Sequence, residues 1–411
     1  MKTFIGFTEA LELTLANVSA GGSEAISLLS AVGRVLAEAV TATVDSPSVS
    51  TSRKDGYAVL PEDLKPASPA TPVRLKLVGS RSAGEMRPLS IHSGEAVRVT
   101  TGALIPEGNV SVISEEFCRR EGETLACLNT AEPGRNILRR GTDVRCGEIV
   151  ATSGATLSPP VLSLIAAAGH GTVRVHPVPR VCVIATGDEV VAPGEPLPEG
   201  KLYASNMIAI CSWLGLHAIP FETAITGDRR EEIRAAIQSR LERADAFITS
   251  GGAWGSEKDL ILQVVAEMGW TGIYHRVRMG PGKPVGFGLL DGRPFFVLPG
   301  GPPSNEMAFL QLALPALVKM KGAGPKLFPM AAARLGDKVT GARGWTEFIH
   351  ARLKKKGGQL WVSPARLKSR LKSMAEKEAL IIIPEDRDEI PAGETIHIQL
   401  LGPPTCEEDR L

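Results

Sequence analysis

The spacing of hydrophobic and polar residues changes twice along this chain, and each change marks a segment with a different predicted structure. Near the N-terminus, apolar residues at helical spacing predict helices over 8–19 and 23–38. From 56 to 151 the pattern becomes short β-branched runs separated by Gly and Pro, which predicts a β-rich segment. The predicted strands of this segment are 57–60, 73–78, 96–99, 110–113 and 149–151. A helix is expected again at 159–169, which begins with two prolines and ends at a glycine.

After a proline-containing linker at 177–179, short apolar strands alternate with helices. The predicted strands are 180–185, 217–224, 245–249, 271–278 and 294–297, and the predicted helices are 205–214, 229–241, 258–268 and 302–319. Such alternation favours a mainly parallel sheet that is covered by helices on both faces. Residues 330–401 return to short strands, including 359–362, 379–383 and 395–401. This last pattern predicts a small β domain at the end of the chain.

The fold class is therefore predicted to be multidomain α/β plus β, since 411 residues suffice for two to four domains. The expected domains are an N-terminal helical and linker domain (1–50 and 138–177), an inserted β-rich domain (51–137), an α/β domain (178–325) and a C-terminal β-barrel-like domain (326–411).

Composition limits the classes of partner and compartment. The net charge of +1 gives no reason to expect a nucleic-acid or acidic-membrane surface. The six cysteines contain no C-x-x-C pair and no zinc pattern, so reduced thiols in a cytosolic protein are expected. Glu9 and Glu12 interrupt any signal-peptide core, and no run reaches the ~18–20 apolar residues of a membrane helix. A soluble, cytoplasmic protein is the expectation.

Three glycine-containing loops follow predicted buried strands of the α/β segment. They are Thr186-Gly187-Asp188-Glu189, Ser250-Gly251-Gly252 and the loop from Pro299 to Pro302. Because ligands of parallel sheets bind at the carboxyl ends of the strands, these loops are expected to meet at one site. Convergent backbone N–H groups suit an anion and carboxylates suit a divalent metal, so the pattern predicts a phosphorylated ligand handled with a metal.

Each of these residues also has a plain structural interpretation. Asp188 and Asp228 could cap helices, and Lys283, in a second glycine-rich loop at 280–284, could be an ordinary surface lysine. The β-rich segment offers further candidates: Asp55 in a turn before a strand, and Thr101 beside a glycine. Asp143 follows an arginine-rich run, whose guanidinium groups suit phosphate binding or a solvated surface.

Taken in order, these motifs resemble the MoeA family of molybdopterin molybdenumtransferases, which includes the C-terminal domain of gephyrin. The motifs are SRKDGYAV, TGALIPEG, GRNILRRGTDV, ATGDEV, SGG, PGKPVGFG and LPGGPPS, and the likeness covers nearly the whole chain. The resemblance implies a homodimer of four-domain subunits whose central domain binds molybdopterin, with a site shared between subunits. It also implies insertion of molybdate into adenylylated molybdopterin with release of AMP, assisted by Mg²⁺, and an adenylyltransferase that supplies the substrate.

The resemblance further assigns roles to residues of this chain. It gives catalytic roles to Asp55, Glu189, Asp228 and Asp259, and metal binding to Glu257 and Asp259. Substrate binding falls to Thr101, Asp143, Thr186, Gly187, Asp188, Ser250, Gly251, Gly252, Lys283, Pro299 and Pro302.

The chain departs from the family pattern at several candidate positions. The departing residues are Lys54, Trp254, Glu257, Gly280, Gly301 and Lys368. Gly280 replaces one of two lysines and so removes a charge-assisted anion contact, while Lys54, Lys368 and Arg370 could supply positive charge from elsewhere. Two interpretations follow: an insertase with an altered pocket, or a paralogue that binds molybdopterin as a carrier or scaffold. Molybdate and tungstate are not distinguished by the sequence.

Overall fold

The computed structural model describes residues 1–411 except 88–89, 107, 253–259, 325–327, 366–367 and 403–411. The chain forms two compact units: the first comprises Met1–Glu24 and His176–Leu411, and the second comprises Ala25–Val175. The finer division into four domains stays a prediction.

The first unit contains a sheet whose central strands are parallel, as the sequence predicts. Its order is β17 (Phe221–Thr226), β14 (Val181–Thr186), β18 (Ala246–Ser250), β21 (Arg293–Leu298), β20 (Gly286–Leu290) and β19 (Thr271–Gly280), with β1 (Lys2–Gly6) beside β19. The first four strands run parallel, whereas β20 is antiparallel to both of its neighbours. All six residues of β14 are buried, because helices cover both faces of the sheet.

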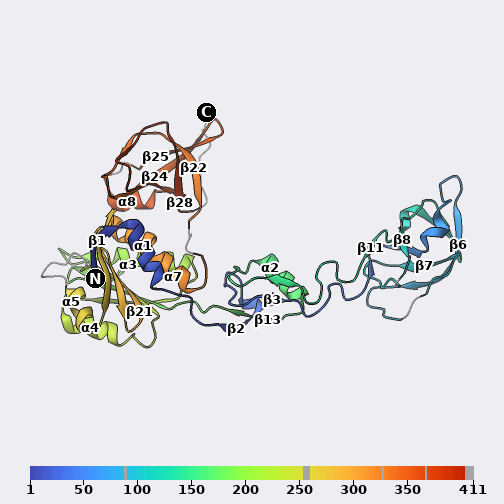
Figure 1. The fold of residues 1–411 in the computed structure, drawn as a ribbon, viewed down its shortest axis with the longest axis horizontal. Helices are drawn as coiled ribbons and strands as arrows, with labels where there is room; N and C mark the ends of the chain where they lie inside the picture. The colour runs from blue at the N-terminus through green and yellow to red at the C-terminus, as the bar shows by residue number, and fades with distance from the viewer. Residues whose placement is uncertain (88–89, 107, 253–259, 325–327, 366–367, 403–411) are drawn as a thin grey trace. The chain divides into compact units, whose positions relative to one another are not determined.

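Helices lie on both sides of this sheet (Figure 1), and a hydrophobic core lies between the sheet and each helical layer. One core is built with α1 (Phe7–Ala16), α3 (Ser205–Leu216), α6 (Pro302–Ala308) and α7 (Leu314–Met320). The other is built with α4 (Arg230–Gln238) and α5 (Leu260–Glu267). Along β14, Val183 enters the first core, and its neighbours Cys182 and Ile184 enter the second. This alternation is the period of two expected of a strand, and it makes the three-layer arrangement.

A small closed barrel completes the first unit. Its strands are β22 (Met330–Leu335), β24 (Thr346–Lys356), β25 (Gln359–Pro364), β26 (Ala379–Ile383) and β28 (Thr395–Leu400). They pair in the order β24-β25-β22-β28-β26, and β26 returns to β24. The short helix α8 (Arg370–Ala375) lies between β25 and β26, and β23 (Val339–Thr340) pairs with β27 (Glu389–Ile390). The barrel continues the α/β sheet, since β19 pairs with β24 through two residue pairs.

The second unit is rich in β structure. Its six-stranded sheet has the order β8 (Ser111–Ser114), β5 (Gly56–Val59), β7 (Glu95–Val99), β6 (Val73–Arg81), β10 (Thr124–Cys127) and β9 (Cys118–Glu121). Three short ladders pair β2 (Glu24–Ser27) with β13 (Thr172–Val175), β3 (Val40–Thr41) with β12 (Ile149–Ala151), and β4 (Thr51–Ser52) with β11 (Ile137–Leu138). Helix α2 (Pro159–Ala167) packs beside β12.

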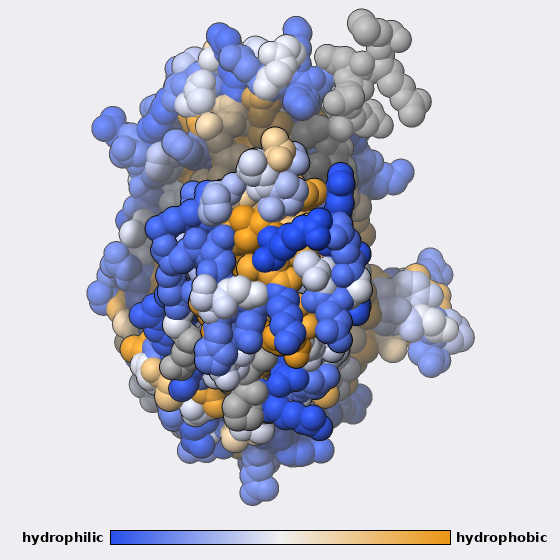
Figure 2. Space-filling model, turned by 90° about the vertical axis from the view of Figure 1, so that its right-hand side faces the viewer, coloured by the Kyte–Doolittle hydropathy of each residue, from blue (hydrophilic) through white to orange (hydrophobic). Residues whose placement is uncertain are grey.

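The surface of the protein and its cysteines do not identify a binding partner. On the face drawn in Figure 2, hydrophilic side chains surround a smaller hydrophobic area. Within the described ranges, no helix has the length and apolar character needed to cross a membrane. The five cysteines of the described part are free thiols.

The predicted helix over 23–38 is wrong. Residues 24–27 form strand β2, and residues 28–30 form a single 3₁₀ turn. Leu29 is 96% exposed and Val32 is 61% exposed, whereas Val35 and Leu36 are buried, so the apolar residues of this segment do not form one helical face. Residues 24–27 form a strand because they pair with β13, which is distant in sequence. The spacing of apolar residues within the segment gives no information about this partner strand.

Several strands were not predicted, among them β1, β9, β10, β20, β22 and β24. β20 contains Gly286 and Gly288, and glycine weakens a strand pattern. The ring of Trp270 lies where a side chain at residue 288 would stand, with its Nε1 2.6 Å from the position of a Cβ. Close packing against Trp270 therefore explains why residue 288 is a glycine, although a glycine makes a strand harder to predict from the sequence.

Candidate functional site

The carboxyl ends of β14, β18 and β21 meet beside a cavity of about 510 Å³. This size lies within the range of small-molecule sites. The described residues that line it are Ala185, Thr186, Glu189, Val190, Leu202, Tyr203, Ala204, Ser205, Asn206, Met207, Ser250, Gly251, Gly300, Gly301, Pro302, Arg370 and Leu371. Five of the predicted site residues are thus brought together: Thr186, Glu189, Ser250, Gly251 and Pro302.

The loop after β18 closes tightly over the loop after β14. Gly251 has φ of +116°, and a Cβ there would lie 2.7 Å from the carbonyl oxygen of Thr186 and 2.8 Å from its Oγ1. The Gly251 N–H donates to the carbonyl of Leu298 at 3.0 Å. Glycine is therefore required at this position, because it joins the ends of three strands and any larger residue would separate them.

Two asparagine amides hold the loop after β21 in place. The Nδ2 of Asn305, a residue only 1% exposed, donates to Ser250 Oγ at 3.0 Å and to the Pro299 carbonyl at 2.8 Å. The Nδ2 of Asn206 donates to the Gly300 carbonyl at 2.8 Å. Sequence reasoning missed both residues, although each lies near the start of a helix that follows a glycine-rich loop or a predicted strand.

The acidic residues divide into one that lines the cavity and two that join loops. Glu189 lines the cavity, and its carbonyl accepts from Leu202 N at 2.9 Å. Asp188 Oδ1 accepts from the backbone N–H of Asp228 at 3.0 Å, which connects the loops after β14 and β17. Helix α4 begins at Arg230 and its N-cap residue is Arg229, so Asp228 lies one residue before the cap position.

Three other predicted residues lie beside these loops and outside the cavity lining. Gly187 donates its N–H to the Thr226 carbonyl at 3.1 Å and so helps hold β14 beside β17. Gly252 packs against Ile261 of α5. Pro299 contributes its carbonyl to Asn305.

The barrel contributes one wall of the cavity. Arg370 and Leu371, at the start of α8, are among the lining residues. Ser369 Oγ accepts from the N–H of Lys372 at 3.3 Å, so the helix begins at Arg370 with a side-chain cap.

Lys283 lies beside two aromatic rings. Its Nζ lies 5.3 Å from the ring centroid of Phe4 and 5.6 Å from that of Trp345. The two rings themselves meet edge to face at 5.6 Å. The ammonium group is thus held by aromatic rings, a cation–π arrangement, and Lys283 is not among the described residues that line the cavity.

Gly280 lies directly against the side chain of Glu347. The two residues are paired between β19 and β24, and the Glu347 Cδ is 2.6 Å from the place of a Cβ on Gly280. Burial raises the pKa of the Glu347 carboxyl above its usual value. A carboxylate therefore fills the space that a side chain at 280 would need.

The second unit brings together the motifs predicted around Asp55 and Thr101. Asp55 Oδ1 accepts from the backbone N–H of Thr101 at 2.6 Å and from its hydroxyl at 3.0 Å. The backbone hydrogen bond, followed by the hydroxyl, lowers the pKa of the Asp55 carboxyl. The Arg53 N–H donates to the carbonyl of Asn136 in the arginine-rich segment at 2.8 Å. Asp143 lies further along, where its N–H donates to the Ser46 carbonyl at 2.9 Å.

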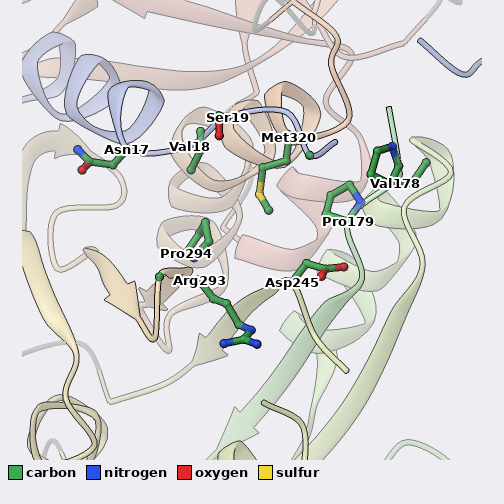
Figure 3. Close-up of a pocket in the computed structure, with 12 residues that line it drawn as sticks. Asn17, Val18, Ser19, Val178, Pro179, Asp245, Arg293, Pro294 and Met320 are labelled. Atoms are coloured by element: carbon green, nitrogen blue, oxygen red, sulfur yellow. The ribbon is translucent and has the colours of Figure 1, made fainter. Parts of the chain in front are cut away.

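A second cavity, of about 320 Å³, lies at the opposite, amino edge of the α/β sheet (Figure 3). Asp245 and Arg293 line it, but their charges are already paired with Arg180 and Asp291. In Figure 3 the two side chains do not converge on a common point. This cavity is accordingly a weaker candidate for an anionic ligand.

Comparison with known proteins agrees with the geometry. Three family profiles match in order: "MoeA N-terminal region (domain I and II)" over residues 5–169, "Probable molybdopterin binding domain" over 182–319, and "MoeA C-terminal region (domain IV)" over 332–401. The chain is 32% identical to molybdopterin molybdenumtransferase 2 of Mycobacterium tuberculosis, over 91% of this chain and 94% of that one. The chain belongs to the MoeA family.

Further relatives of this MoeA-family chain have similar coverage. Molybdopterin molybdenumtransferase of Haemophilus influenzae is 31% identical over 92% of this chain and 93% of its own. Among solved structures, the molybdopterin biosynthesis MoeA protein of Pyrococcus horikoshii superimposes with a TM-score of 0.83 at 30% identity. That match covers 97% of this chain and 100% of the other.

A metal site in this MoeA-family chain is not formed by the described residues alone. Glu257 and Asp259, the predicted ligands, lie outside the described residues. In the described part of the chain, no three His, Cys, Asp or Glu side chains are grouped closely enough to hold an ion. Glu189 is the one carboxylate among the described residues that line the cavity.

Proposed function

We propose that this protein inserts the metal of molybdate or tungstate into adenylylated molybdopterin and releases AMP. One observation carries the proposal: the 510 Å³ cavity lies in the segment matched by the molybdopterin-binding profile, at the edge of the sheet where ligands of such folds bind. The names of the M. tuberculosis and H. influenzae relatives, which match nearly from end to end, support it further.

The lining suits a phosphorylated heterocycle. Ser205 and Asn206 open helix α3, whose first N–H groups have no partner within the helix and can face an anion. Ser250 and Thr186 add hydroxyl groups, while Val190 and Leu202 give an apolar wall for a ring. In this proposal the chain binds and orients the pterin and its phosphate link, and the metal–sulfur bonds belong to the ligand.

We propose in addition that the protein acts as a homodimer in which Asp55, Thr101 and Asp143 of one subunit complete the cavity of the other. The support is the family resemblance, together with the loop held by the Asp55–Thr101 hydrogen bonds in the second unit. Mixed dimers test it. Asp55→Ala and Gly251→Val subunits should each be inactive, and mixing them should restore up to about a quarter of the activity, from dimers with one intact site. Absence of restoration in a verified mixed dimer would argue against a shared site.

Magnesium, a cytoplasmic location and an adenylyltransferase that supplies the substrate belong to the same proposal. The described residues provide no complete metal site. Removal of divalent cations by chelation should stop AMP release, and Mg²⁺ should restore it.

The carrier or scaffold alternative has less support, because the relatives that match nearly the full length are named as transferases. AMP release from adenylylated molybdopterin tests the choice. With Mg²⁺ present, the amount of AMP that the purified protein releases should rise with the concentration of molybdate or tungstate. Glu189→Gln should reduce the rate of AMP release with little change in folding. Tight pterin binding without AMP release would favour the carrier.

A further inference from the structure

The start of helix α8 brings one basic side chain to the cavity. Arg370 belongs to the barrel, yet it lines the cavity formed by the α/β loops. Among the described lining residues it is the single lysine or arginine, and Glu189 is the single acid. No hydrogen bond or ion pair joins the Arg370 guanidinium to another described residue. The group is therefore available to an incoming anion.

A buried ion pair fixes the helix that carries Arg370. Lys377 follows α8, and its Nζ lies 2.8 Å from both carboxylate oxygens of Glu306 in α6. The two side chains are 5% and 6% exposed. The third ammonium hydrogen goes to the Met374 carbonyl at 2.9 Å, so all donors of Lys377 are used. A pair this well satisfied holds the barrel helix against the α/β domain in one position.

The same carboxylate connects to a second wall of the cavity. Trp213 Nε1, in α3, donates to Glu306 Oε1 at 3.4 Å. Helices α3 and α6 both begin at the cavity, with Ser205 and Pro302 among the lining residues. Glu306 thus ties α8 to the two helices whose first residues face the ligand.

The position at which the family resemblance places a cationic side chain is filled differently in this chain. Position 280 carries glycine, and the Glu347 carboxylate occupies the adjacent space. Lys283, the remaining lysine of that loop, is held over Phe4 and Trp345. Arg370 is the basic side chain that the described lining offers to the ligand's phosphate.

We propose that Arg370 is a substrate-binding residue that contacts the phosphate group of the pterin ligand, and that the Glu306–Lys377 pair positions it. The guanidinium group can donate two parallel hydrogen bonds to a phosphate, which gives both attraction and orientation. This inference rests on the proposed function, since it names the group that recognises the charged part of the same ligand.

The test compares ligands with and without the phosphate. Molybdopterin and its dephosphorylated form are titrated anaerobically into the full-length protein and its variants. Arg370→Ala should weaken molybdopterin binding by roughly 10- to 100-fold, the usual effect of a lost hydrogen bond to a charged group. Binding of the dephosphorylated form should change by less than about twofold. Arg370→Lys should retain part of the affinity, because it keeps the charge but loses the paired geometry.

Lys372→Ala is the matched control, since Lys372 is a basic residue of the same helix, exposed and absent from the cavity lining. It should bind both ligands as the unmodified protein does. For the positioning pair, the double variant Glu306→Leu/Lys377→Met should keep its fold but lose part of the preference for the phosphorylated ligand.

The outcomes separate the inference from the proposed function. Equal weakening of both ligands in Arg370→Ala, or no weakening of either, would overturn the role of Arg370 and leave the proposed function standing. Failure of the unmodified protein to bind molybdopterin would instead remove the proposed function itself.

Discussion

The side-chain amide of Asn305 donates to the hydroxyl of Ser250 across 3.0 Å, and this hydrogen bond joins the first turns of α6 to the end of β18. The same nitrogen also reaches the Pro299 carbonyl. One buried amide thus sets the spacing of two loops that border the cavity, although it does not line the cavity itself.

Replacement of Asn305 by alanine should therefore affect both stability and binding. Loss of the amide leaves the buried Ser250 hydroxyl and the Pro299 carbonyl without their donor, which costs about 1–3 kcal/mol. Urea unfolding measures the change in the free energy of unfolding, and titration with molybdopterin measures affinity. Asn206→Ala, which removes one hydrogen bond at a less buried position, should be milder; equal effects would contradict the importance assigned to burial.

Gly251→Ala should damage the site more than Gly301→Ala does. A side chain at 251 meets the backbone and the hydroxyl of Thr186 and must adopt an unfavourable positive φ, a strain of roughly 1–3 kcal/mol. A Cβ at Gly301 meets no atom within 4 Å, and its φ of −70° suits any residue. Thermal unfolding of both variants measures the difference. A Gly251→Ala protein as stable as Gly301→Ala would show that the loop after β18 is able to move away.

Lys377→Met alone should be strongly destabilising, because the Glu306 carboxylate then remains buried without its partner, at a cost of about 3–5 kcal/mol. The double variant Glu306→Leu/Lys377→Met should recover most of this loss, since no charge stays buried. Denaturant unfolding of the single and double variants forms the test. If the double variant is as unstable as the single one, packing and not charge determines the effect.

Stability should also decline on acidification through His350. Burial, and then the charge of Lys377, lowers the pKa of His350 to about 4, whereas an unfolded histidine titrates near 6.5. Between these two values the unfolded chain binds the proton and the folded chain does not, so stability falls as the pH drops from 6.5 to 4. The free energy of unfolding should fall by on the order of 2 kcal/mol, a figure reduced because solvent partly screens the His350 side chain. The His350→Gln variant should not show this fall. The free energy of unfolding of both proteins, measured across this range, tests the difference; parallel curves would contradict it.

Most strands of the α/β domain could be predicted, since buried β-branched runs such as 181–186 leave a clear pattern. The segment 23–38 could not, because its strand pairs with residues almost 150 positions later in the chain, and local spacing carries no trace of that partner. Strand β20 was not predicted because it contains Gly286 and Gly288, and only the absence of a side chain at Gly288 leaves room for the ring of Trp270.

In the candidate site, too, some residues could be predicted from the sequence around them, whereas others are placed by contacts between distant segments. Thr186, Ser250 and Gly251 follow buried strands, and a rule about strand ends suffices to find them. Asn305 acts through contacts between separate elements, and nothing in its own neighbourhood marks it. Arg370 is noticed in the sequence as a possible source of positive charge, but its place in the cavity lining depends on the packing of the barrel. The pocket roles of Asp55 and Asp143, and the metal roles of Glu257 and Asp259, stay predictions.

The pairing of Met279 with Thr346 and of Gly280 with Glu347 makes the barrel an extension of the α/β sheet. A hinge between the two bodies would have to break this hydrogen-bonded ladder before it could turn. Amide hydrogens of β19 and β24 should consequently exchange with solvent at similar slow rates, as members of one cooperative unit. Arg370 then belongs to a part of the protein that does not rotate relative to the α/β sheet. Binding of the ligand by this wall of the cavity would depend on the conformation of the Arg370 side chain and not on a domain movement.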